Sequence, residues 1–161
     1  MEILQHSLKK VDRSSLNDFQ KEILRIITNH FEGLMTEKIS NDSIVEETPF
    51  LEIIIRLKGD SFVLSLSVRN DMFLLNSNYF DINIYPETRL DLVNLLVGEA
   101  LLGNYEIILS YGASEKLVRK EIIFDNHELN EFNQEQKIGL FSKKVKRDEK
   151  KHGIQLIYSI P

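Results

Sequence analysis

The sequence lacks several features that would assign it to a class of protein. It has no cysteine, which excludes disulfides, zinc–thiolate sites and thiol catalysis. Its first residues do not have the basic-then-apolar layout of a signal peptide. The most apolar stretch, residues 92–102, contains polar side chains and is far shorter than the ~20 residues that a membrane span needs. We therefore expect a soluble protein of the cytoplasm with no membrane partner.

Motifs for catalysis and for metal or cofactor binding are also missing. The four histidines form no H-x-x-x-H or H-x-H pair, and His30 falls on the apolar stripe of a predicted helix, where a hydrogen-bonded histidine is commoner than a ligand. Residues 110–114 lack the G-x-S-x-G form of a nucleophile turn. Gly98 and Gly103 have the glycine spacing of a phosphate-binding loop, but no Lys-Ser/Thr pair follows. The sequence therefore predicts no catalytic residue, no metal site and no cofactor, and a protein that is not an enzyme.

What the sequence does have is a globular composition with unevenly distributed charge. With 161 residues, 42% of them hydrophobic, the chain is long enough to bury a core by itself, and we expect one domain over residues 1–161. Residues 137–152 contain seven Lys or Arg against two acids, a net charge of +5. The other residues contain 13 basic against 23 acidic groups, a net of −10, and the two add to −5. A molecule polarised in this way usually meets a partner through its charges.

Apolar periodicity predicts two main helices. Within residues 14–35, apolar side chains recur at three- and four-residue spacing, and Ser15 is the expected N-cap. The second helix is expected to start near Pro86, which suits a first helical turn, and to end at Gly103.

Period-two alternation predicts the strands and the fold. Strands over 50–58 and 62–69 flank a glycine-containing turn, which is typical of a hairpin. The further strands expected are 72–75, 80–84, 105–111, 117–124, 138–145 and 154–160, with 125–136 as a loop or a short acidic helix. Because no strand–helix–strand rhythm is sustained, we predict an α+β fold with a single antiparallel β-sheet of about six to eight strands and two main helices packed on one face.

The basic segment is expected at the end of strand 138–145 and in the turn that follows it. Clustered Lys and Arg side chains are what nucleic-acid binding requires. The candidate phosphate contacts are Lys143, Lys144, Lys146, Arg147, Lys150 and Lys151. The alternative is a solvated hairpin tip whose lysines keep an edge strand from aggregating.

Acidic residues form a second candidate surface. Four of them, Asp125, Glu128, Glu131 and Glu135, have near-helical spacing, and Glu46 and Glu47 form a smaller acidic pair. Such a surface would dock onto a basic partner, because complementary potentials accelerate encounter and select partners. The alternative is a solvated loop.

The sequence therefore favours a non-catalytic protein-binding module. The first hypothesis is a cytoplasmic immunity protein or antitoxin that neutralises a basic, nuclease-like partner by occlusion. The second is a dimeric chaperone for a secreted substrate, which requires an exposed apolar groove and a homodimer. The third is a nucleic-acid-contacting factor that uses the basic hairpin 143–152.

Overall fold

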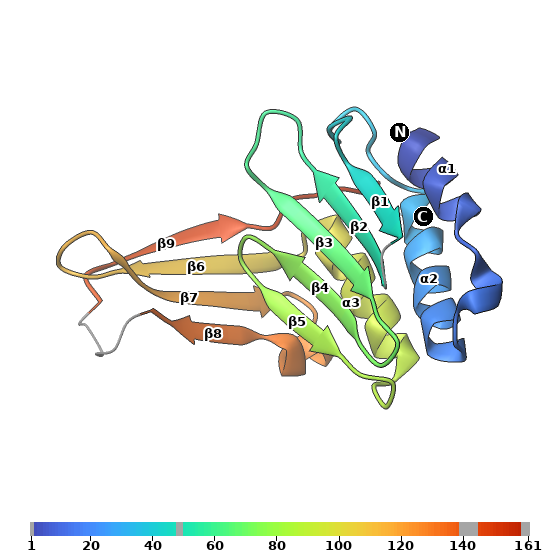
Figure 1. The fold of residues 1–161 in the computed structure, drawn as a ribbon. Helices are drawn as coiled ribbons and strands as arrows, with labels where there is room; N and C mark the ends of the chain where they lie inside the picture. Colours follow the sequence, from blue (N-terminus) through green and yellow to red (C-terminus); the bar gives the residue numbers. More distant parts are fainter. Residues whose placement is uncertain (1, 48–49, 139–144, 159–161) are drawn as a thin grey trace.

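The fold combines α-helices with two antiparallel β-sheets (Figure 1). The computed structural model describes residues 2–47, 50–138 and 145–158. The helices are α1 (Glu2–Lys10), α2 (Asp18–Phe31), α3 (Leu90–Leu102) and the 3₁₀ helices η1 (Arg13–Ser15) and η2 (His127–Phe132). The strands are β1 (Ile44–Glu47), β2 (Leu51–Arg56), β3 (Val63–Val68), β4 (Phe73–Ser77), β5 (Asp81–Ile84), β6 (Tyr105–Tyr111), β7 (Leu117–Phe124), β8 (Gln134–Lys137) and β9 (Arg147–His152). The predicted α+β class with antiparallel strands is confirmed.

The prediction of a single sheet of six to eight strands is wrong. The nine strands of the described residues form a five-stranded sheet, in the order β1-β2-β3-β4-β5, and a four-stranded sheet, in the order β8-β7-β6-β9. The sheets are separate because α3 carries the chain away from β5. Gly103 then ends the helix in the left-handed conformation (φ 76°) and turns the chain directly into β6.

The predicted hairpin and both main helices are present, with shifted helix starts. β2 and β3 pair in register around a turn in which Gly59 has a positive φ of 71°. The N-cap of α2 is Asn17 and not Ser15, because Asn17 and Gln20 form a reciprocal capping box. The α3 helix begins at Leu90, since the residues before it form a turn. No helix was predicted over the residues of α1.

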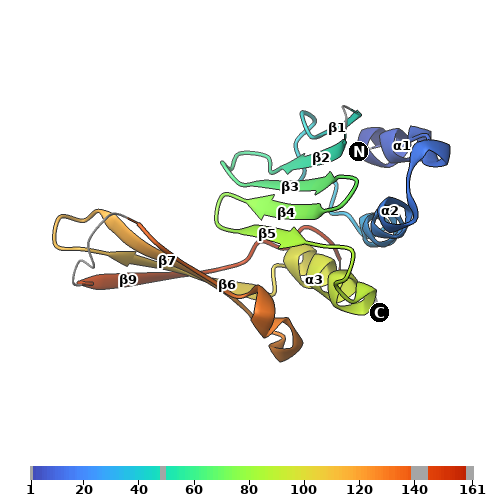
Figure 2. The ribbon, with the colours of Figure 1, turned by 60° about the horizontal axis from the view of Figure 1, so that its bottom comes forward.

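One continuous core joins the two sheets and the helices. On β2, β4 and β5 the buried residues alternate with half-buried or exposed ones, and on β3 they do so apart from the buried Ser67, so the first sheet has one inner and one outer face. Helices α2 and α3 pack together on the inner side, and α1 lies beside β1 (Figures 1 and 2). The rings of Phe80, Tyr105 and Phe124 contact one another where the two sheets meet, with centroids 5.5 to 6.3 Å apart.

The second sheet, which we call the arm, extends beyond the first (Figures 1 and 2). The strand predicted over 138–145 falls largely outside the described residues. The basic residues that follow it form strand β9 instead of a turn, and β9 pairs with β6. The strand predicted over 154–160 is wrong where the structure describes it, because residues 153–158 form no strand and Ile157 makes an isolated bridge with Leu34. The predicted C-terminal hairpin is therefore wrong, and β8 lies at the edge of the arm opposite β9.

The segment after β9 returns to the body of the protein. Its Leu156 donates its backbone N–H to Leu101 O (2.7 Å) and accepts from Met35 N (2.8 Å). Leu156 and Ile157 are fully buried, so this segment closes the core between α3 and the residues that follow α2. None of the helices in the described part of the chain combines the length and apolar character needed to cross a membrane.

Candidate protein-binding surface

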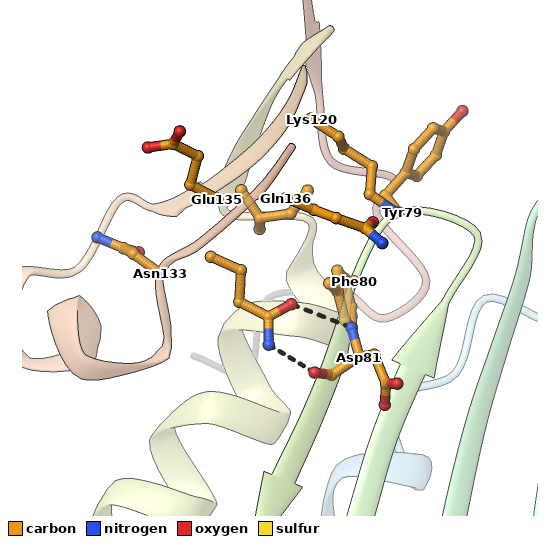
Figure 3. Close-up of a pocket in the computed structure, with 9 residues that line it drawn as sticks. Tyr79, Phe80, Asp81, Lys120, Asn133, Glu135 and Gln136 are labelled. Atoms are coloured by element: carbon orange, nitrogen blue, oxygen red, sulfur yellow. Dashed lines mark hydrogen bonds between the residues drawn. The ribbon is translucent and has the colours of Figure 1, made fainter. Parts of the chain in front are cut away.

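A polar hollow of about 440 Å³ lies where the edge of the first sheet meets the arm (Figure 3). Side chains from the β4–β5 turn form one wall, and side chains from β7 and β8 form the other. The lining residues are Tyr79, Phe80, Asp81, Lys120, Ile122, Asn133, Gln134, Glu135 and Gln136. Three carboxamides, two carboxylates and one ammonium group line this hollow, so it suits a polar ligand or polypeptide better than an apolar one.

Within this hollow, one side chain takes the place of a neighbouring strand. The Asp81 backbone N–H donates to Gln134 Oε1 at 3.1 Å, and Gln134 Nε2 donates to the Asp81 carbonyl oxygen (dashed lines in Figure 3). These are the two bonds that a residue of an added strand would make with the edge of β5. The Gln134 carboxamide therefore joins the arm to the first sheet and satisfies part of this edge.

The acidic segment beside the hollow is held in place by its own polar and apolar contacts. Asn126 Oδ1 accepts the backbone N–H of Glu128 at 3.0 Å and caps η2. Leu129 is completely buried beneath the segment, whereas Asp125, Glu128 and Glu131 are exposed. The sequence prediction of an acidic surface thus corresponds to an anchored turn of 3₁₀ helix.

A neighbouring arginine lies among these carboxylates. Arg89 forms a hydrogen-bonded ion pair with Asp91. This pairing, with further attraction from Glu128 and Glu131, raises the pKa of the guanidinium. Of these three carboxylates, Asp91 pairs with the guanidinium, while Glu128 and Glu131 attract it from farther away, and with this one cation they leave a local net charge of −2. We call Arg89, Asp91, Asp125, Glu128 and Glu131 the acidic surface.

Apolar side chains lie beside the acidic surface. Tyr85 is 47% exposed and Leu90, which precedes Asp91 in the chain, is 39% exposed. An exposed tyrosine such as Tyr85 is a common anchor of protein–protein contacts, and Leu90 adds apolar area.

The other predicted acidic residues do not belong to the acidic surface. Glu135 lies on β8 and forms an ion pair with Lys137 (3.7 Å). Glu46 and Glu47 lie on β1, at the opposite edge of the first sheet from β5. There Glu46 faces Glu52 across the strand pair. The six acidic candidates therefore fall in separate places, and three of them, Asp125, Glu128 and Glu131, are together.

Most of the basic side chains on β9 are paired with carboxylates. Lys150 binds Glu106 (3.0 Å), while Lys151 binds Glu149 (3.2 Å) and lowers the pKa of that carboxyl. Arg147 lies 4.5 Å from the centre of the Tyr111 ring and contacts carboxylates of two residues, Glu115 and Glu149. Lys146 is exposed, and Lys143 and Lys144 lie outside the described residues. The strand thus attracts a polyanion less strongly than its number of basic residues indicates.

The free edge of β9 is unsuited to pairing with its own copy. The Gly153 N–H donates to Tyr105 O at 2.7 Å, so the odd-numbered residues of β9 point their backbone groups toward β6 and the even-numbered residues point outward. In an antiparallel dimer, the outward, even-numbered residues of one β9 strand would pair with the outward, even-numbered residues of the other. Every such register places one residue opposite the same residue of the second copy. From 147 to 152 every residue is charged or a histidine, so each such register sets identical groups face to face.

The described residues contain no group of three or more His, Cys, Asp or Glu side chains placed to hold a metal ion. The prediction that His30 is hydrogen-bonded is confirmed, because its Nε2 lies 3.1 Å from the Asn94 carbonyl oxygen, to which it donates.

Several residues of this region carried no recognisable signal in the sequence. Asp81 and Gln134 are 53 positions apart, and an isolated glutamine on a short polar strand has no pattern that marks it. The setting of Arg89 was not predicted because, besides the nearby Asp91, the carboxylates that attract it come from η2, which is distant in sequence.

Comparison of the chain with protein-family models, with curated proteins and with solved structures found no match.

Proposed function

We propose that this chain is a non-catalytic protein-binding module of the immunity or antitoxin type, which neutralises a basic partner by occlusion. The observation that carries the proposal is the acidic surface: Glu128 and Glu131 are exposed on an anchored segment, and Arg89, which attracts them, is paired with Asp91. A basic protein that docks there would have its own cationic surface covered, and its substrate excluded.

The surroundings of the acidic surface support a protein partner over a small ion or a polyanion. Tyr85 and Leu90 offer apolar area next to the carboxylates, as interface anchors inside a charged rim do. Leu129 and the Asn126 cap hold the segment in place, so little conformational entropy is lost when it binds.

The two alternative functions have weaker support. A nucleic-acid-contacting factor needs unpaired cations, whereas Arg147, Lys150 and Lys151 are in ion pairs. A chaperone for a secreted substrate needs an apolar groove, whereas the hollow beside β5 is lined mainly by polar groups.

The test compares two variants that remove the same number of charges. In the first, Glu128→Gln/Glu131→Gln changes the acidic surface, and in the second, Glu46→Gln/Glu47→Gln changes β1. Tagged protein from the native host should retain a stoichiometric basic partner, whose affinity for the purified chain falls about tenfold in the first variant and stays unchanged in the second. The purified chain should also inhibit the activity of that partner.

The salt dependence of the affinity provides a second readout. Binding through the acidic surface should weaken as salt screens the carboxylates, and less so in the first variant. Equal loss of affinity in both variants would show that overall charge matters and the acidic surface does not. A chain without a stoichiometric basic partner, whose deletion leaves growth unchanged, would refute the proposed function.

A further inference from the structure

We propose that the free edge of β5 accepts an extended, basic segment of the partner as an added strand, and that Gln134 occupies this edge when the partner is absent. This inference rests on the proposed function, because it names how the basic partner is held.

The pairing of β4 with β5 establishes which backbone groups are free. Ser77 N donates to Phe80 O at 2.8 Å, and Phe73 to Asn76 pair in register with Ile84 to Asp81. Because backbone groups alternate in direction along a strand, Ile82 and Ile84 point theirs toward β4, whereas Asp81 and Asn83 point theirs away from the sheet.

The two outward residues differ in what they bind. Asp81 has both backbone groups bonded to the Gln134 carboxamide. Asn83 is exposed, and within the described part of the chain no hydrogen bond involves its outward N–H or C=O. An edge with unpaired donors and acceptors is a template for another strand.

The Gln134 carboxamide has the geometry of one peptide group of that missing strand. It is a side-chain group attached to the arm, so rotation about its own bonds releases Asp81 without disturbing the β7–β8 ladder, in which Gln134 takes part through its backbone. With Gln134 displaced, the edge would offer two successive outward residues, which is enough for four backbone hydrogen bonds.

The charges near this edge select a basic segment. The hollow beside Asp81 is lined by two carboxylates, Asp81 and Glu135, and by one cation, Lys120. The acidic surface precedes Gln134 in the chain, with Glu131 only three residues away. Lys or Arg side chains of an added strand that point to the side of Asp81 would therefore find carboxylates, whereas an acidic segment would be repelled.

The experiment uses a defined probe, an octapeptide of alternating lysine and valine. A matched octapeptide carries N-methyl groups on alternate backbone nitrogens, so it keeps every charge and loses the hydrogen-bond donors of one edge. Binding to the full chain is followed by NMR. We expect the first peptide to shift and protect the Asn83 amide, and the N-methylated peptide to bind about tenfold more weakly.

Two pairs of variants separate the backbone edge from its side chains. Asn83→Pro removes the outward N–H and leaves the β4 ladder intact, since proline is tolerated where an edge N–H faces solvent, while Asn83→Thr keeps the N–H. We expect Asn83→Pro to weaken the peptide about tenfold and Asn83→Thr to change little. Gln134→Ala removes the competing carboxamide and should tighten binding several-fold, whereas Gln136→Ala, in the same hollow, should not.

The outcomes distinguish this inference from the proposed function. Equal affinity for the two peptides and no effect of Asn83→Pro or Gln134→Ala would overturn the inference, and a loss in Glu128→Gln/Glu131→Gln would still support the acidic surface. The reverse pattern would support strand addition and count against the acidic surface. A concentration-dependent dimer of the chain that Asn83→Pro abolishes would assign the edge to a second copy and overturn the inference.

Discussion

Tyr105→Phe is expected to stabilise the protein, and by more at alkaline pH than at neutral pH. Tyr105 is 1% exposed at the start of β6. In the described part of the chain its buried hydroxyl makes no hydrogen bond of good geometry. Burial raises the pKa of this phenol to about 12. The nearby backbone of Ile154 lowers the pKa by a smaller amount.

The expected gain in the free energy of unfolding has two parts. At neutral pH, removal of a buried hydroxyl without a good partner should raise the free energy of unfolding by about 1 kcal/mol. At higher pH the unfolded chain ionises its tyrosine near pH 10, while the folded chain resists ionisation up to about pH 12. The wild type therefore loses stability as pH rises through this window, by about 1.4 kcal/mol at pH 11. The Phe variant has no such loss, so its advantage should grow to about 2.4 kcal/mol at pH 11.

The assay is urea denaturation of both proteins at pH 8, 10 and 11. Tyr85→Phe is the control, because that ring is 47% exposed and its substitution should leave the pH dependence unchanged. If the difference between Tyr105→Phe and the wild type were the same at pH 8 and pH 11, the phenol would ionise normally in the fold, and the reasoning from burial would be wrong.

Four further substitutions test the packing, the turns and a helix cap. The methyl group added by Gly153→Ala would lie 2.5 Å from the carbonyl oxygen of Gly103, so thermal denaturation should show that the free energy of unfolding falls by about 3 kcal/mol or more. The methyl group added by Gly59→Ala would have no atom within 4 Å, but this residue has a positive φ of 71°, so the free energy of unfolding should fall by about 1 kcal/mol. Asn17→Ala removes the N-cap of α2 and a 2.7 Å bond to the β3–β4 turn, so we expect about 1–2 kcal/mol of destabilisation in urea. Leu129→Ala should cost about 3 kcal/mol and speed hydrogen exchange across η2; unchanged exchange there would show that this side chain does not anchor the segment.

The sequence predicted the elements that have a strict period. Apolar and polar residues alternate along β2 and β3 because one face of each strand is buried. A short turn joins the two strands, so both the strands and their pairing could be predicted. The division into two sheets could not, because it depends on where the chain goes after α3. Gly103 directs it there through a backbone angle that the sequence alone does not reveal.

The charged strand β9 is a second element that could not be predicted from the sequence. Six consecutive residues without an apolar side chain predict a turn. They form a strand because β6 supplies the backbone bonds and Glu106, Glu115 and Glu149 neutralise the cations. Of the proposed binding region, the acidic residues of η2 could be predicted from spacing, while Asn83 and Gln134 matter through backbone geometry and a contact distant in sequence.

The return of residues 153–158 into the core has a consequence for biosynthesis. Leu156 and Ile157 fill space between helices made earlier. Leu156 bonds through its backbone to Leu101 and Met35, and the Tyr158 N–H donates to the Gly33 carbonyl oxygen. The core therefore cannot close until residues 153–158 have left the ribosome. Until then a nascent chain would keep the end of α2 and the last turn of α3 exposed to chaperones, and a stop codon only a few residues before Leu156 would leave a protein without a finished interior.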